Sequence, residues 1–132
     1  MLNIMVVDDS LIIRKTLSTE LEKMGHTIVA KAKSGKEAVN LYREFLPDLV
    51  TMDITMPIMS GIDALKEIIK DYKDAKIIMV TSHGEERLVM DAISSGAKGY
   101  ILKPITKEKI ENVIVKVVPE YKEELDKILT SS

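Results

Sequence analysis

The chain has 132 residues, close to the modal size of one domain, and at this length roughly two thirds of the unfolded surface can be buried in a single core. Its 19 basic and 21 acidic residues give a net charge of −2, without the clustered basic excess that nucleic-acid binding requires. Because it lacks cysteine, a signal sequence and any apolar run near the ~18 residues of a membrane span, we expect a cytoplasmic domain without disulfides, thiolate metal sites or membrane insertion.

Short apolar runs alternate with helical patterns along the chain. Three of the runs are almost continuous in Val, Ile, Leu and Met, as is typical of central parallel strands, whereas the second and fifth are shorter and more polar, as edge strands should be. The five strands are expected at residues 3–7, 27–31, 48–52, 76–80 and 98–102.

Apolar residues at helical spacing predict helices between these strands. Ile13, Leu17 and Leu21 share one face before Gly25, and a second stripe surrounds Tyr42. Further helices are expected at residues 61–70, 85–95 and 106–118. With right-handed crossovers, the alternation predicts an α/β fold, a doubly wound (βα)5 flavodoxin-like parallel sheet with strand order 2-1-3-4-5.

The tail departs from this alternation. Pro119 disfavours helix at Val118 but suits the first turn of a new helix, so we expect an extra C-terminal helix. Its apolar residues Tyr121, Leu125 and Ile128 share one face, which needs burial against the domain or against a partner.

Polar residues follow four of the predicted strands. They are Asp8-Asp9, Asp53, Thr81 and Lys103-Pro104. Each has an ordinary explanation in isolation, such as a helix cap for the first pair and turn chemistry for the threonine. Because the carboxyl ends of parallel strands share the edge where open α/β folds bind ligands, we expect all four groups to meet in one crevice.

These residue types together suit phosphoryl transfer. Carboxylates form an oxygen site for Mg²⁺, with Mn²⁺ as a substitute, and we expect Asp8, Asp9, Asp53 and the backbone carbonyl of Thr55 to contribute to the metal shell. With the ion offsetting charge, Asp53 would attack a phosphoryl donor and become an aspartyl-phosphate. Lys103 and the hydroxyl of Thr81 would bind phosphoryl oxygens. The sequence therefore predicts a phosphorylation switch.

This set of residues resembles the signature of receiver domains of two-component response regulators, over about residues 3–118. The segment from Asp48 to Pro57 is also similar to chemotaxis regulators of the CheY type. The resemblance implies a receiver domain at residues 1–118 and an additional helix and tail at residues 119–132. It also implies a single-domain regulator that takes a phosphoryl group from a histidine kinase. Its other implied partners are a protein target, such as a flagellar motor switch protein, and a phosphatase.

The resemblance implies roles for individual residues. Lys103-Pro104 would be a cis peptide, and Tyr100 would move inward as Thr81 follows the phosphoryl group. Thr55 and His83 would adjoin the phosphoryl group and modulate its hydrolysis. The chain would catalyse its own phosphorylation and dephosphorylation, so we interpret it as a phosphoacceptor and not as an enzyme. Its output surface is expected at residues 85–118.

Other functions remain as alternatives. The nearest is a stand-alone receiver in another phosphorelay or in a sporulation or other regulatory pathway. A metal-dependent phosphatase of the haloacid-dehalogenase type would carry an Asp-x-Asp motif. In this chain Thr55 stands where the second aspartate of that motif would be. An FMN carrier would need a phosphate-cradling loop after the first strand, where this chain has two acids. Metal binding would separate an active receiver from an inert interaction module.

Overall fold

The computed structural model describes residues 1–82 and 86–130 of the chain. Within these residues five strands alternate with helices, and a sixth helix follows the fifth. The strands are β1 (Asn3–Val7), β2 (Thr27–Ala32), β3 (Leu49–Asp53), β4 (Ile77–Thr81) and β5 (Gly99–Leu102). The helices are α1 (Leu11–Lys23), α2 (Gly35–Phe45), α3 (Gly61–Asp71), α4 (Glu86–Ser94), α5 (Lys107–Val117) and α6 (Pro119–Thr130).

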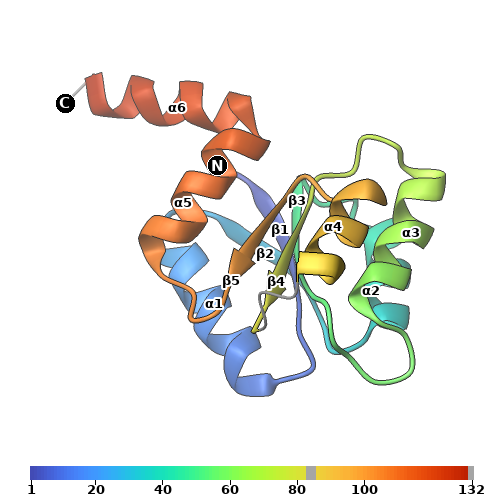
Figure 1. Cartoon of the computed structure of the whole chain (residues 1–132). Helices are drawn as coiled ribbons and strands as arrows, with labels where there is room; N and C mark the ends of the chain where they lie inside the picture. The colour runs from blue at the N-terminus through green and yellow to red at the C-terminus, as the bar shows by residue number, and fades with distance from the viewer. Residues whose placement is uncertain (83–85, 131–132) are drawn as a thin grey trace.

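The strands form one parallel sheet in the order β2-β1-β3-β4-β5, which confirms the predicted doubly wound α/β fold. Helices α1 and α5 cover one face of the sheet, and α2, α3 and α4 cover the other (Figure 1). No helix within residues 1–82 and 86–130 is long and apolar enough to cross a membrane.

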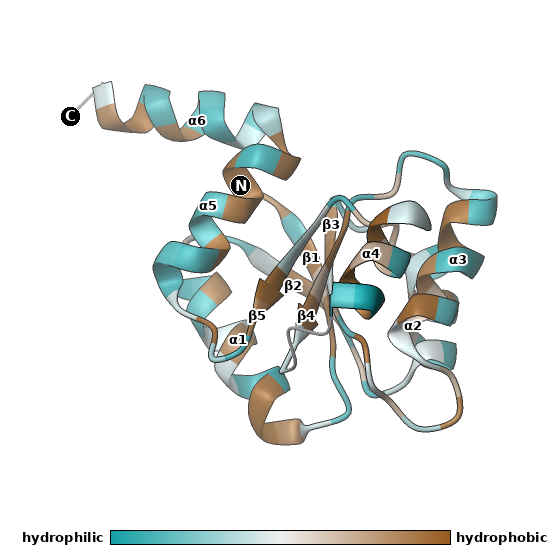
Figure 2. Ribbon diagram, in the orientation of Figure 1, coloured by the Kyte–Doolittle hydropathy of each residue, from teal (hydrophilic) through white to brown (hydrophobic). Residues whose placement is uncertain are grey.

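Two apolar cores lie on the two faces of the sheet because alternate strand residues point in opposite directions. Met5 and Met52 belong to the core beneath α2 and α3, whereas Ile4 and Ile78 belong to the core beneath α1 and α5. The ribbon coloured by hydropathy has apolar strands between helices whose polar residues lie outside (Figure 2). Burial on both faces explains the continuous apolar runs of the central strands.

The predicted strand limits needed small corrections. The third and fourth strands were expected to stop one residue earlier, but Asp53 pairs with Val80 and Thr81 pairs with Leu102, so both polar residues end their strands. The second strand was expected to be short, but β2 is a six-residue edge strand because pairing continues as far as Ala32. Both β2 and β5 are edge strands, as expected.

Helix α6 packs against the domain mainly through its first turn. Tyr121 is buried, its hydroxyl donates to Glu111 Oε1 at 2.7 Å, and its ring centroid lies 5.0 Å from that of His26. Leu125 is partly buried, and Ile128 is half exposed. Beyond its first turn the helix extends away from the sheet, on the side opposite the carboxyl ends of the strands (Figure 1). The domain therefore covers the part of the expected apolar face of α6 that lies near Pro119.

We expect acid to weaken the packing at the base of α6. His26 is buried, its Nδ1 accepts a hydrogen bond from the backbone N–H of Leu2, and its Nε2 has no partner among the described residues. Burial lowers the pKa of His26 below its ordinary value of 6.5, although Glu111 and Glu124 oppose this shift. A depressed histidine pKa contributes stability that is present above pH 6.5 and is lost as the pH falls through the folded pKa.

Urea unfolding between pH 8 and pH 5 tests this expectation. The fall in unfolding free energy on acidification should be smaller for His26→Gln than for the wild type, because the variant has no imidazole to protonate. Tyr121→Phe keeps the aromatic ring and the imidazole, so it should keep the wild-type pH dependence. Equal pH dependence in the wild type and His26→Gln would contradict the expectation.

Candidate functional site

Three carboxylates meet at the carboxyl edge of the sheet. Asp8 follows β1 and Asp53 ends β3, two strands that are neighbours, and Asp9 is next in sequence. One oxygen from each of Asp8, Asp9 and Asp53 lies within 4.8 Å of the others. Asp8 and Asp53 are buried, whereas Asp9 is exposed. The cluster therefore has a buried floor and an open side.

Hydrogen bonds hold Asp8 at its backbone N–H, at its backbone carbonyl and at both carboxylate oxygens. Its backbone N–H donates to the carbonyl of Ala32 at 3.1 Å, and its backbone carbonyl accepts from Arg14 Nη1 at 2.6 Å. Its Oδ1 accepts from the backbone N–H of Ser10 at 2.9 Å, and its Oδ2 accepts from Lys103 Nζ at 2.9 Å. The sequence analysis did not identify Arg14, although a basic residue soon after two acids and a helix cap was a signal that could have found it.

Lys103 connects the two buried acids. Its Nζ lies 2.9 Å from Asp8 Oδ2 and 3.7 Å from Asp53 Oδ1. The backbone N–H of Lys103 donates to the carbonyl of Thr81 at 2.8 Å, which fixes the start of the loop after β5. The Lys103-Pro104 peptide is cis, as the family resemblance implied. The lysine was expected to bind a phosphoryl oxygen, and in the structure it pairs with carboxylates.

The charge balance of the cluster suits a divalent cation. Burial raises the pKa of Asp53 from 3.8 to about 6, Asp8 adds to this rise, and Lys103 opposes it. When all groups are ionised, three carboxylates and one ammonium leave a charge of −3 + 1 = −2. Oxygen ligands with uncompensated negative charge are the set that Mg²⁺ prefers. The residues present therefore fit the ion that the sequence analysis expected.

The remaining predicted residues lie at different depths. Thr81 is buried at the end of β4, next to β3, and Thr55 is exposed two residues after Asp53. Tyr100 lies on the edge strand β5 with 48% of its surface exposed, so it occupies an outward position and not the inward one expected of a switched state. His83 lies outside the described residues.

The loop between Asp53 and Gly61 is fixed at both ends. The backbone N–H of Gly61 donates to the carbonyl of Ile54 at 2.7 Å, and an added Cβ at Gly61 would lie 1.9 Å from the backbone oxygen of Asp53. Only glycine permits this close approach. The sequence analysis did not assign Gly61 a role at the site, because a contact between backbones has no side-chain signature.

A γ-turn projects one apolar side chain from this loop. The backbone N–H of Met59 donates to the carbonyl of Pro57 at 2.8 Å, and Ile58 between them has φ +70°. Met56 is buried and Met59 packs against the core, whereas Ile58 is fully exposed. A β-branched residue with positive φ is strained, so the two anchored methionines hold the turn in place.

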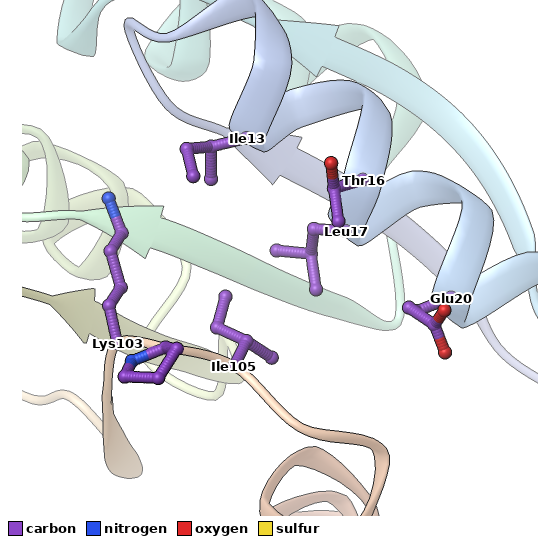
Figure 3. Close-up of a pocket in the computed structure, with 7 residues that line it drawn as sticks. Ile13, Thr16, Leu17, Glu20, Lys103 and Ile105 are labelled. Carbon is purple, nitrogen blue, oxygen red and sulfur yellow. The ribbon is translucent and has the colours of Figure 1, made fainter.

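An apolar pocket of about 180 Å³ adjoins the cluster. Figure 3 shows Ile13 and Leu17 of α1 facing Ile105 across the pocket, with Lys103 at one end. The pocket's lining is Ile13, Thr16, Leu17, Glu20, Lys103, Pro104 and Ile105. The aliphatic stem of Lys103 therefore borders the pocket while its ammonium group reaches the acids.

Comparison with known proteins identifies the family. The sequence model of the response regulator receiver domain family matches residues 4–115, so the chain belongs to this family. It is 45% identical over 115 residues to the chemotaxis protein CheY of Bacillus subtilis, covering 87% of this chain and 96% of that protein. It is 43% identical over 114 residues to the chemotaxis protein CheY of Thermotoga maritima, covering 86% of this chain and 95% of that protein.

Solved structures agree with the fold. A CheX-CheY-BeF3-Mg²⁺ complex from Borrelia burgdorferi contains a chain that matches with a TM-score of 0.84 and 38% identity, covering 87% of each chain. A response regulator receiver domain protein from Clostridium thermocellum matches with a TM-score of 0.85 and 30% identity, covering 92% of this chain and 98% of that one.

Proposed function

We propose that this protein is a chemotaxis response regulator in which Asp53 accepts a phosphoryl group from a histidine kinase. The observation that carries the proposal is the cluster of three carboxylates within 4.8 Å, two of them in reach of Lys103. Similarity to chemotaxis proteins over 86–87% of the chain supports the pathway. The main alternative is a receiver in another phosphorelay.

Asp53 is the proposed nucleophile. One of its carboxylate oxygens forms a bond to phosphorus while the bond from phosphorus to the donor histidine nitrogen breaks, and that nitrogen leaves with the electron pair. Because the pKa of Asp53 is about 6, its carboxyl group is ionised in most molecules at neutral pH and is then able to attack. The ion pair with Lys103, at 3.7 Å, would help to hold the Asp53 carboxylate at the sheet edge for the donor.

A bound Mg²⁺ would offset the negative charge of donor and acceptor. Asp9 and Asp53 would hold the ion directly, Asp8 would act through water, and Thr55 would contribute its backbone carbonyl; Mn²⁺ would substitute for Mg²⁺. Lys103 would then pair with a phosphoryl oxygen, and the Thr81 hydroxyl would donate to another. Thr55 and His83 would modulate hydrolysis of the aspartyl-phosphate. The chain would therefore contribute to its own dephosphorylation as well as to its phosphorylation.

The proposed output surface consists of α4, β5 and α5. Met90, Ile93, Tyr100 and Leu102 are exposed there, and they help to line a hollow of about 430 Å³. Thr81 ends β4, which precedes α4, and Lys103 follows β5, so a phosphoryl group bound by both would alter packing there first. We propose a flagellar motor switch protein as the target and a phosphatase as a second partner. Residues 1–118 would form the receiver, with residues 119–132 as an addition.

Beryllofluoride with Mg²⁺ provides a test, because it imitates a bound phosphoryl group. Amide hydrogen exchange should change at Thr81, at the end of β4, and in α4, β5 and α5, including Tyr100. Changes confined to α1 and α2 would contradict the proposed output surface. Binding to a flagellar motor switch protein that depends on beryllofluoride would support chemotaxis, whereas unchanged binding would favour another pathway.

A further inference from the structure

A guanidinium group holds the peptide that joins the two acids after β1. Arg14 lies in α1, where its backbone N–H donates to the carbonyl of Ser10 at 3.0 Å. Its side chain turns back, and Nη1 donates to the backbone carbonyl of Asp8 at 2.6 Å. This contact is partly buried, so water competes weakly for the same carbonyl.

We propose that Arg14 is a positioning residue for Asp9, and through Asp9 for the metal of the proposed phosphorylation site; the proposal rests on that function. The carbonyl of Asp8 and the backbone N–H of Asp9 belong to one planar peptide group. Holding the carbonyl oxygen therefore holds the plane of this peptide group, which includes the Cα atom of Asp9. Arg14 sets the direction of the Asp9 side chain without touching it.

Asp9 needs this support more than the other two acids. Asp53 ends a strand that is paired on both sides, and Asp8 is held through its backbone and both carboxylate oxygens. Asp9 is exposed, and within residues 1–82 and 86–130 its carboxylate makes no hydrogen bond or ion pair. Its position therefore depends on the backbone on either side, where Arg14 and the Ser10 helix cap act.

Two opposite effects follow from removing Arg14. The positive guanidinium near a cluster of carboxylates repels a second cation, so if its charge dominated, removal would tighten Mg²⁺ binding. If positioning dominates, removal lets Asp9 sample other directions, and Mg²⁺ binding weakens. The sign of the change in Mg²⁺ affinity therefore distinguishes the two effects.

The experiment compares Arg14→Met with Lys15→Met. Both variants remove one positive charge from adjacent positions of α1, but Lys15 is exposed and has no contact with the Asp8 peptide. Mg²⁺ affinity is measured by amide NMR titration. We expect the Kd to rise about tenfold in Arg14→Met, within the range found for residues that orient metal ligands, and to change by less than about twofold in Lys15→Met.

Phosphorylation by acetyl phosphate adds a readout that a purely structural role would not move. The Mg²⁺ concentration for half-maximal rate should rise about tenfold in Arg14→Met, while the rate at saturating Mg²⁺ should stay within about twofold of the wild type. Arg14→Lys retains the charge and one donor group, so it should fall between the wild type and Arg14→Met. It also provides the same comparison if the methionine variant does not fold.

A measurement without metal separates this proposal from the proposed function. Amide exchange at Ser10, whose N–H donates to Asp8 Oδ1, should be faster in Arg14→Met than in Lys15→Met, even if no variant accepts a phosphoryl group. Unchanged or tighter Mg²⁺ binding in Arg14→Met would overturn the positioning role. A wild type that binds Mg²⁺ but is never phosphorylated would instead count against the function of Asp53.

Discussion

Asp53→Asn is expected to abolish phosphorylation and, at the same time, to stabilise the metal-free protein at neutral pH. The two effects have one cause, because the carboxylate that we propose as the nucleophile is buried and poorly solvated. Burial and the neighbouring Asp8 raise its pKa from 3.8 to about 6. A carboxyl group whose pKa is higher in the folded than in the unfolded state destabilises the fold once it is ionised in both states. Asparagine removes that charge.

The expected gain has a defined pH range. A rise of about two pH units corresponds to roughly 3 kcal/mol above pH 6, or roughly 10 °C in Tm for a domain of this size. The penalty is absent below the unfolded pKa of 3.8 and grows as the pH rises towards 6. Urea unfolding without metal at pH 8 and at pH 4 measures it: the difference between variant and wild type should be large at the first pH and nearly absent at the second.

The loss of phosphorylation is measured with acetyl phosphate and Mg²⁺. Asp53→Asn should not acquire the acid-stable, base-labile phosphoryl group of an aspartyl-phosphate. Asp63→Asn is a matched control, because Asp63 is an exposed acid in the first turn of α3. If Asp53→Asn were labelled at the wild-type rate, Asp53 would not be the acceptor. Equal stability of variant and wild type at pH 8 would refute the electrostatic argument separately.

Gly61→Ala is expected to have the largest structural effect among the residues near the site. The new Cβ would lie 1.9 Å from the backbone oxygen of Asp53, and no flexible side chain can move aside to relieve the contact. Either α3 or the loop after Asp53 must shift, so we expect a loss of about 3 kcal/mol or more in unfolding free energy. Mg²⁺ affinity should fall with it, because Asp53 and Thr55 lie in the displaced backbone.

Gly99→Ala provides the control for this substitution. Its new Cβ would lie 3.0 Å from Cγ1 of Val113, a side-chain atom that has more room to adjust than a backbone oxygen. We therefore expect a smaller loss of stability and unchanged Mg²⁺ affinity. A Gly61→Ala variant with the unfolding free energy and Mg²⁺ affinity of the wild type would show that the loop is more adaptable than the structure indicates.

The sequence was sufficient for the fold because its patterns were local and repeated. Continuous apolar strands alternating with amphipathic helices leave few topologies once crossovers are right-handed, and the observed strand order is the one expected. The same rule brought Asp8 and Asp53 to one edge. Strand ends were less predictable, because the last pair of β3 depends on Val80 in another strand.

Individual contact partners from distant segments were less predictable than the elements themselves. Tyr121 was expected to need burial, but nothing local indicated that it would meet His26, which precedes it by 95 positions (121 − 26 = 95). Lys103 and Asp8 were expected to meet at one edge of the sheet, but the lysine was expected to bind a phosphoryl oxygen and not the Asp8 carboxylate. Propensity and periodicity describe one element at a time, whereas the contact of Tyr121 with His26 depends on how α6 packs against the completed domain.

At Ile58 in the γ-turn, a substitution that would stabilise the fold would also change the surface of the loop that follows Asp53. Isoleucine in a left-handed backbone conformation costs on the order of 1–2 kcal/mol, and its fully exposed side chain gains nothing from burial. Glycine there would relieve the strain, so engineering for heat tolerance would begin at this residue. The same loop follows directly from Asp53, the proposed acceptor, so under that proposal it forms part of the surface that a phosphoryl donor would meet. A variant made more stable in this way would therefore present a different surface to the proposed donor.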